Sequence, residues 1–163
     1  MISKKMQDAL NKQINAEFYS SYLYLAMAAH FEDTNMNGFA NWMSMQSAEE
    51  YGHAMKIYNY LNNVGAKVEL HAIDQPKSGW NEPVDAFKDA LNHEKKVTKM
   101  INDLADLAVE EKDHATNIFL HWFVTEQVEE VASVEDIVTK FEMIGDNKGA
   151  LFMFDRELGQ RQE

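Results

Sequence analysis

Cysteine is absent from this sequence of 163 residues. The chain therefore forms no disulfide bond and offers no thiolate to a metal. Zinc-ribbon and iron–sulfur chemistry are excluded, and any metal must be held by oxygen and nitrogen ligands.

Positive charge and long apolar runs are also scarce. The 15 Lys and Arg residues are outnumbered by 27 Asp and Glu residues, which gives a net charge of −12. This balance argues against a basic surface for nucleic acid and suits solubility or the attraction of cations. No run approaches the roughly 18 apolar residues of a membrane span, and residues 1–8 lack the apolar core of a signal peptide. We expect no nucleic-acid partner, no membrane partner and a cytoplasmic location.

Helix-breaking residues are few, with seven glycines and two prolines. We expect helices over residues 3–32, with Ser3 as N-cap, and 38–63, then a third helix from about residue 83. A weakly marked joint at 112–114 leads to a fourth helix that ends at Gly145. A chain of this length with 45% hydrophobic residues buries the core of one domain, so we expect a single domain over 1–163. It comprises a four-helix bundle over 3–145 and a short apolar helix over 149–159.

The segment 66–81 breaks the helical pattern and contains Pro76 and Gly79. About 16 extended residues reach roughly 50 Å, whereas a helix of about 28 residues is roughly 42 Å long. The segment can therefore run the length of the bundle, which makes the third helix parallel to the second. The predicted fold is an all-α four-helix bundle with one long crossover connection.

Polar residues interrupt the apolar stripe of each long helix close to its midpoint. These residues are Glu17, Glu50 with His53, Glu94, and Gln127 with Glu130. An E-x-x-H pair alone is weak support for a metal site, because a lone His on an apolar helix face is usually a hydrogen-bonded core residue. Four carboxylates at one level of a core would repel one another, however, and two divalent cations would neutralise them. The pattern matches di-iron carboxylate bundles, except that the fourth helix offers Gln-x-x-Glu where Glu-x-x-His is usual, so we expect unequal metal affinities.

With these residues in place, the chain closely resembles prokaryotic non-haem ferritins over essentially its whole length. The matching stretches are 11–17, 49–54, 93–94, 126–130 and 155–161. The resemblance implies a ferritin-like fold and a ferroxidase. In that reading Glu17, Glu50 and His53 bind one iron. Glu94 and Glu130 bind the second with Gln127 beside it, and Glu50 bridges the two.

The resemblance also implies roles for residues around the iron pair. Tyr24 and Trp122 match aromatic positions that are candidates for donating electrons to oxygen, with core packing as the alternative for both. Four acidic residues match a third iron site, for which a solvated acidic helix face is the alternative; they are Glu49, Glu126, Glu129 and Glu130. No haem is expected, because Gly52 aligns with the Met haem ligand of bacterioferritins. Rubrerythrin-type peroxidases carry a Cys-rich module that this chain lacks, and the DNA-coating mini-ferritins lack the apolar final helix.

The apolar stretch Leu151, Phe152, Met153 and Phe154 finds no room in a bundle already filled by four helices, so we expect it to bury against other subunits. The resemblance implies a homo-oligomeric cage of about 24 copies. A local cap over one end of the same bundle is the alternative. The implied function is oxidation of Fe(II) by O2 and storage of Fe(III) as a hydrated oxide in the cage. A non-enzymatic helical scaffold or cation buffer is the competing hypothesis.

Overall fold

Helices account for all regular structure within residues 2–162, which are the residues that the computed structural model describes. They are α1 (Lys4–Asp33), α2 (Asn37–Asn63), α3 (Pro83–Glu110), α4 (His114–Ile144) and α5 (Lys148–Leu158). The predicted all-α fold and its order of elements are confirmed. The predicted helix ends differ from these by about two residues or fewer, within the ordinary spread of helix ends.

Side-chain caps and left-handed residues fix where the helices begin and end. Ser3 caps α1 by accepting a hydrogen bond from the backbone N–H of Met6 at 3.0 Å. Asp113 caps α4 by accepting from the N–H of Thr116 at 3.0 Å. The joint before α4, weakly marked in the sequence, turns at Lys112, whose φ of 55° is left-handed. The chain therefore reverses sharply enough for α3 and α4 to pack side by side.

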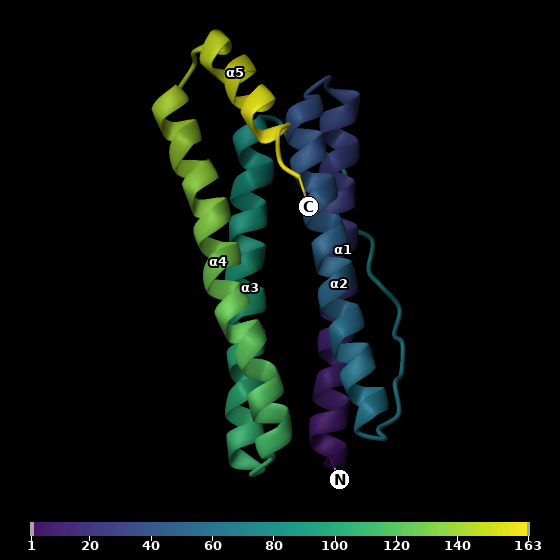
Figure 1. The fold of residues 1–163 in the computed structure, drawn as a ribbon. Coiled ribbons are helices and arrows are strands. Elements are labelled where there is room, and N and C mark those ends of the chain that lie inside the picture. The colour runs from purple at the N-terminus through teal and green to yellow at the C-terminus, as the bar shows by residue number, and fades with distance from the viewer. Residues whose placement is uncertain (1, 163) are drawn as a thin grey trace.

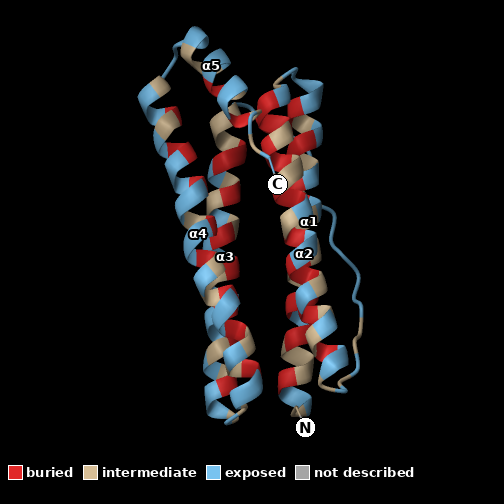
Figure 2. Cartoon of the chain, viewed as in Figure 1, coloured by how far each residue is buried: buried red, intermediate tan, exposed pale blue. Residues whose placement is uncertain are grey.

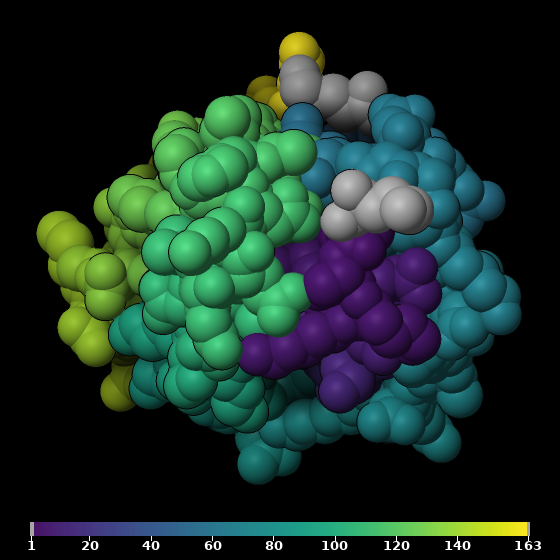
Figure 3. Space-filling model, turned by 90° about the horizontal axis from the view of Figure 1, so that it is seen from below, coloured from purple at the N-terminus to yellow at the C-terminus, as the bar shows by residue number. Residues whose placement is uncertain are grey.

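The four long helices form two antiparallel hairpins, α1 with α2 and α3 with α4, that face each other (Figure 1). The crossover between α2 and α3 runs along the outside of the first hairpin, so α3 is parallel to α2, as predicted (Figure 1). Side chains of α1 hydrogen-bond to the backbone of the crossover segment. Asn11 Oδ1 accepts from the N–H of Glu69 at 2.8 Å, and Asn15 Nδ2 donates to the carbonyl of Ala72 at 3.0 Å. Viewed along the bundle, the start of α1 lies against the turn between α3 and α4 (Figure 3).

Buried residues line the facing sides of the two hairpins and divide into two apolar clusters (Figure 2). One cluster, near α5, is built around Phe39, Phe87 and Phe141. The other, near the start of α1, contains Leu10, Leu61 and Leu120, among others. On every long helix the polar residues singled out in the sequence fall between the positions that belong to the two clusters. A polar layer therefore separates the two halves of the core.

The position of α5 differs in part from the expectation that its apolar residues bury only against other subunits. Phe154 is buried within its own subunit, with its ring centre 5.2 Å from that of Phe141 and 5.8 Å from that of Phe39. The sequence argument that the whole apolar stretch lacks room in the bundle is therefore wrong for this residue. The bundle opens toward α5 and accepts one face of that helix. Phe152 and Met153 lie on its other face and are each 62% exposed.

Candidate metal centre

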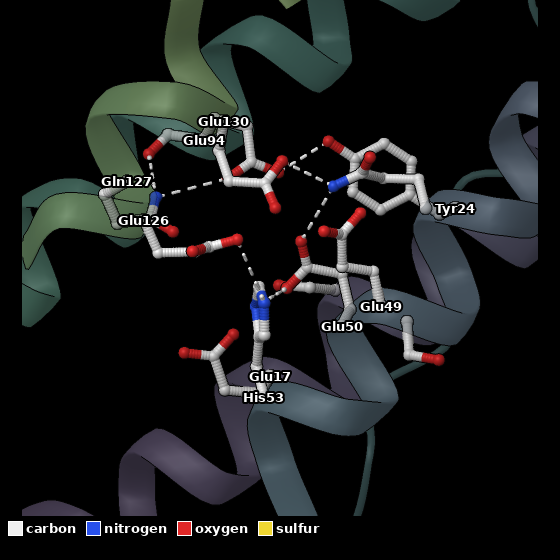
Figure 4. A network of polar contacts seen from close by, with 12 residues as sticks. Glu17, Tyr24, Glu49, Glu50, His53, Glu94, Glu126, Gln127 and Glu130 are labelled. Atoms are coloured by element: carbon white, nitrogen blue, oxygen red, sulfur yellow. Dashed lines mark hydrogen bonds and ion pairs between the residues drawn. The ribbon is translucent and has the colours of Figure 1, made fainter. Parts of the chain in front are cut away.

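The polar layer of the core gathers one or two side chains from each long helix (Figure 4). Each is at most 5% exposed, and together they are Glu17, Glu50, His53, Glu94, Gln127 and Glu130. Residues three apart on α2 and on α4 point the same way, so each of these helices presents an adjacent pair to the core. The structure thus brings together all six residues that the sequence predicted for an iron pair.

Glu17, Glu50 and His53 form one group, with ligand atoms that all lie within 4.8 Å of one another. His53 Nδ1 is 3.3 Å from Glu50 Oε2. Gln13 Nε2 donates to Glu17 Oε1 at 2.8 Å, but Glu17 Oε2 is buried without a hydrogen-bond partner among residues 2–162. A buried carboxylate oxygen without a donor is costly unless a cation occupies the space beside it.

Glu50, Glu94 and Glu130 form a second group under the same distance limit, so Glu50 belongs to both. Tyr24 donates its hydroxyl to Glu94 Oε1 at 2.5 Å, and Gln127 Nε2 donates to Glu94 Oε2 at 3.2 Å. Glu130 Oε2 accepts from a glutamine amide, whereas Glu130 Oε1 is the second buried oxygen left without a partner in the described chain. Each group thus contains one unpaired carboxylate oxygen.

Burial and mutual repulsion make these carboxylates hard to ionise. Loss of solvent raises the pKa of Glu17, and the charge of Glu50 raises it further. Burial also raises the pKa of Glu50 and of Glu94. The pKa of Glu130 is raised to about 8 by burial and then by the charges of Glu94 and Glu49. A pair of cations would relieve this repulsion, and oxygen ligands with one imidazole suit divalent and trivalent iron.

A third group lies beside the second and contains Glu49, His53, Glu126 and Glu130. His53 Nε2 is 3.9 Å from Glu126 Oε1. Burial raises the pKa of Glu126, and the charges of Glu49 and Glu129 add to the shift. Glu129 itself is exposed and belongs to none of the three groups found in residues 2–162. The structure therefore places His53 where the sequence suggested Glu129.

The two aromatic candidates differ in position. Tyr24 is fully buried and contacts Glu94 directly. Trp122 is 38% exposed, its ring centre lies 5.4 Å from that of His53, and the ammonium of Lys56 sits 3.9 Å above the Trp122 ring. Tyr24 thus touches a candidate ligand, whereas Trp122 packs against one at the outer edge of the centre.

Sequence reasoning missed three residues that hydrogen-bond to the candidate ligands. Gln13 and Gln46 each precede a ligand by four positions, and that helical spacing was a usable signal. Gln46 Nε2 donates to Glu130 Oε2 at 2.6 Å and to Glu50 Oε1 at 3.2 Å, so it ties α2 to α4. Arg161 reaches Glu49 from the carboxyl-terminal segment, and nothing in the local sequence indicated that contact.

Comparison with known proteins finds relatives of the same length and fold. Residues 7–144 match the family model described as "Ferritin-like domain". The chain is 42% identical over 161 residues to a bacterial non-heme ferritin of Staphylococcus aureus, covering 99% of this chain and 97% of that protein. It is 45% identical to a bacterial non-heme ferritin of Bacteroides fragilis, covering 99% and 100%. A solved structure of an open pore ferritin from Archaeoglobus fulgidus superposes with a TM-score of 0.98 at 50% identity, covering 99% of this chain and 100% of that one.

Proposed function

The chain belongs to the ferritin family, and from that premise we propose that it stores iron and oxidises Fe(II) with O2 at the buried centre between its four long helices. The proposal is carried by one observation above all. Glu50 is shared by two groups of buried candidate ligands, and each group contains a carboxylate oxygen that no donor within residues 2–162 satisfies. Two iron ions bridged by Glu50 would use those oxygens and neutralise the layer.

The ligand roles follow from the two groups. Glu17, Glu50 and His53 bind one iron, and Glu94, Glu50 and Glu130 bind the other. Gln127 lies beside the second iron and contributes a neutral amide where a charged or imidazole ligand is usual, which supports unequal affinities. Carboxylates satisfy Fe(III) better than Fe(II), so the site favours the oxidised product, while the single imidazole keeps affinity for the ferrous substrate. Each Fe(II) gives up one electron, and O2 is the acceptor.

The surroundings of the pair complete the proposed reaction. We assign the supply of further electrons to Tyr24 and Trp122; the hydrogen bond of Tyr24 to Glu94 and the contact of Trp122 with His53 support this role. We assign a third iron site, on the path of Fe(III) away from the pair, to Glu49, His53, Glu126 and Glu130, with the exposed Glu129 at its edge, where its charge acts on Glu126. Haem is not part of the proposal.

We further propose that the chain is a single ferritin-like domain that assembles into a cage of about 24 copies in the cytoplasm, where Fe(III) collects as a hydrated oxide. The exposed face of α5 and the full-length similarity to ferritins support the assembly. None of the helices within residues 2–162 combines the length and apolar character needed to cross a bilayer.

An anaerobic iron titration followed by air separates this function from a cation buffer. We expect the metal-free protein to bind about two Fe(II) per subunit tightly without oxygen, as a two-metal site requires. On exposure to air an oxygen electrode should record immediate uptake in proportion to the bound iron. A protein that binds the same iron and consumes no more oxygen than free Fe(II) does is a buffer, and that result would remove the ferroxidase from the proposal.

A further inference from the structure

The carboxyl-terminal segment places an arginine against the acidic layer. Arg161 Nη2 donates to Glu49 Oε2 at 2.7 Å, and Arg161 Nη1 donates to Gln46 Oε1 at 2.9 Å. The guanidinium carbon lies 4.7 Å from the centre of the Trp42 ring. The backbone there is held as well, since Asn41 Nδ2 donates to the carbonyl of Arg161 at 3.2 Å. Three different kinds of contact therefore fix this one side chain on α2.

Both partners of Arg161 lead to candidate iron ligands. Glu49 belongs to the group that also contains His53, Glu126 and Glu130. Gln46 donates to Glu50 and to Glu130 with the amide nitrogen that Arg161 does not touch. Because Arg161 accepts no hydrogen bonds, it fixes the Gln46 amide with its oxygen outward and its nitrogen toward the carboxylates.

Within residues 2–162, Arg161 and His53 are the only basic side chains that form ion pairs with carboxylates of the three groups, and Arg161 is the one that always carries a charge. The other contacts to these carboxylates come from amides and a phenol, which donate hydrogen bonds without adding charge. The ion pair is not sealed from water, because the Arg161 side chain is 26% exposed and the Glu49 side chain 38%. An open hollow of about 370 Å³ beside it is lined by Met45, Ala48, Glu49, Arg161 and Gln162. The guanidinium has space into which it can withdraw.

We propose that Arg161 is a positioning residue that acts as a replaceable counter-ion: it holds Glu49 while the group formed by Glu49, His53, Glu126 and Glu130 is empty, and it weakens metal binding there. This inference rests on the proposed role of that group as the site next to the iron pair. A metal ion on Glu49 would stand close to the guanidinium and repel it. Because such coupling is reciprocal, Arg161 lowers the affinity of this site, and a metal in this site loosens the carboxyl-terminal segment. A weakened neighbouring site passes iron onward instead of retaining it.

Zn(II) titration of the metal-free assembled protein tests the inference, because Zn(II) binds without any oxidation. Calorimetry of Glu49→Gln beside the unsubstituted protein identifies the Zn(II) site that depends on Glu49, because only the affinity of that site should fall. Arg161→Gln should tighten that site by about fivefold, the scale of a partly exposed ion pair. Arg161→Lys, which keeps a positive charge, should stay near the unsubstituted protein. With Glu49→Gln already present, Arg161→Gln should have no effect.

Arg156→Gln is the matched control, because Arg156 is the only other arginine of the chain, is exposed and forms no ion pair in the described part of the chain. It should leave every Zn(II) affinity unchanged. A second readout is the emission of Trp42 in a variant with Trp80→Phe and Trp122→Phe. That emission should change as the Glu49 site fills, and only when Arg161 is present.

The outcomes distinguish this inference from the function on which it rests. An intact Glu49 site whose affinity Arg161→Gln leaves unchanged or lowers would overturn the counter-ion role alone. A Trp42 emission that does not change as that site fills would also overturn the counter-ion role alone. If no Zn(II) binding in any variant depends on Glu49, both the counter-ion role and the third iron site are wrong, whereas the iron pair would be untouched.

Discussion

Amide side chains hold the buried carboxylates of the centre without neutralising them. Gln13 donates to Glu17, Gln46 to Glu50 and Glu130, and Gln127 to Glu94. A lysine or arginine in those places would satisfy the same oxygens but would also supply the positive charge that the layer needs. Because the amides add no charge, the negative charge is left for a metal. The negative charge of the centre is therefore not compensated by the protein itself, which suits the centre to binding cations.

The first prediction concerns pH. The pKa of Glu130 is about 8 in the folded protein, against about 4.3 in an unfolded chain. Between these values the folded state holds a proton that the unfolded state has lost, so the contribution of Glu130 to stability is fully present below about pH 4 and is lost as the pH rises toward about 8. We expect the unfolding temperature of the metal-free protein to fall between about pH 6 and pH 8.5, as measured by calorimetry.

Glu130→Gln is the control for that experiment, because glutamine keeps the shape and cannot ionise. Its unfolding temperature should fall less steeply over the same range. Equal slopes for the two proteins would show that Glu130 does not carry a strongly raised pKa.

At the scale of the elements, α5 depends on one close approach to α2. Gly38 lies where an added Cβ would fall 1.6 Å from the backbone oxygen of Asp155. The same contact region includes a hydrogen bond from the N–H of Phe39 to Asp155 Oδ1 at 2.9 Å. Only glycine fits such a separation, so this position decides whether α5 can lie on the bundle and whether Arg161 can reach Glu49.

The second prediction follows from that contact. Gly38→Ala should displace α5 and lower the free energy of unfolding by about 3 kcal/mol, the upper end of the usual cost of overpacking a core. Chemical denaturation of the variant measures the loss. Gly79→Ala is the matched control, since an added Cβ there meets nothing within 4 Å among the described residues of the subunit. A Gly38→Ala protein as stable as the control would mean that α5 docks differently.

The sequence predicted most of the bundle and the meeting of all six polar residues in its core, because helix period and midpoint position are local properties. Glu17, Glu50, Glu94 and Glu130 each interrupt the apolar stripe of a different long helix near its midpoint, and the midpoints of helices packed side by side lie at one level. The contacts that the sequence did not predict arise only where separate elements pack against one another. Phe154 enters the bundle because α2 and α4 leave space at that end, and Arg161 meets Glu49 only after α5 has folded back. Neither contact has a local pattern.

At the scale of the whole molecule, one subunit leaves considerable apolar surface exposed. Met143 is 82% exposed, and Phe152 and Met153 are each 62% exposed at the same end of the subunit. Several large apolar side chains exposed at one end of a subunit are typical of a surface that contacts other chains. Since Phe154 already occupies the core, the outward face of α5 is the part that other subunits would cover.

The third prediction separates these two faces. Phe152→Ser combined with Met153→Ser should weaken assembly while the helical content of the subunit is kept, as sedimentation and circular dichroism would show. Phe154→Ala should instead lower the stability of the subunit by about 3 to 5 kcal/mol, the usual cost of truncating a buried Phe. If the double serine variant still forms cages of unchanged stability, the outward face of α5 is not an interface.

The bridging position of Glu50 is the central claim, and oxygen uptake at low iron loading tests it most directly. Glu50→Ala should remove the ligand shared by both iron ions and slow the first oxidation by roughly 100-fold or more. Glu129→Ala should leave that first turnover nearly unchanged, because Glu129 is exposed and lies outside the three groups found in residues 2–162. It should alter only the later course of the reaction. Stopped-flow absorbance with parallel oxygen-electrode traces measures both variants, and assembled cages should form in both. Equal impairment of the first turnover by the two substitutions would contradict the account, because it would mean that these side chains act as one delocalised acidic cluster without a bridged pair.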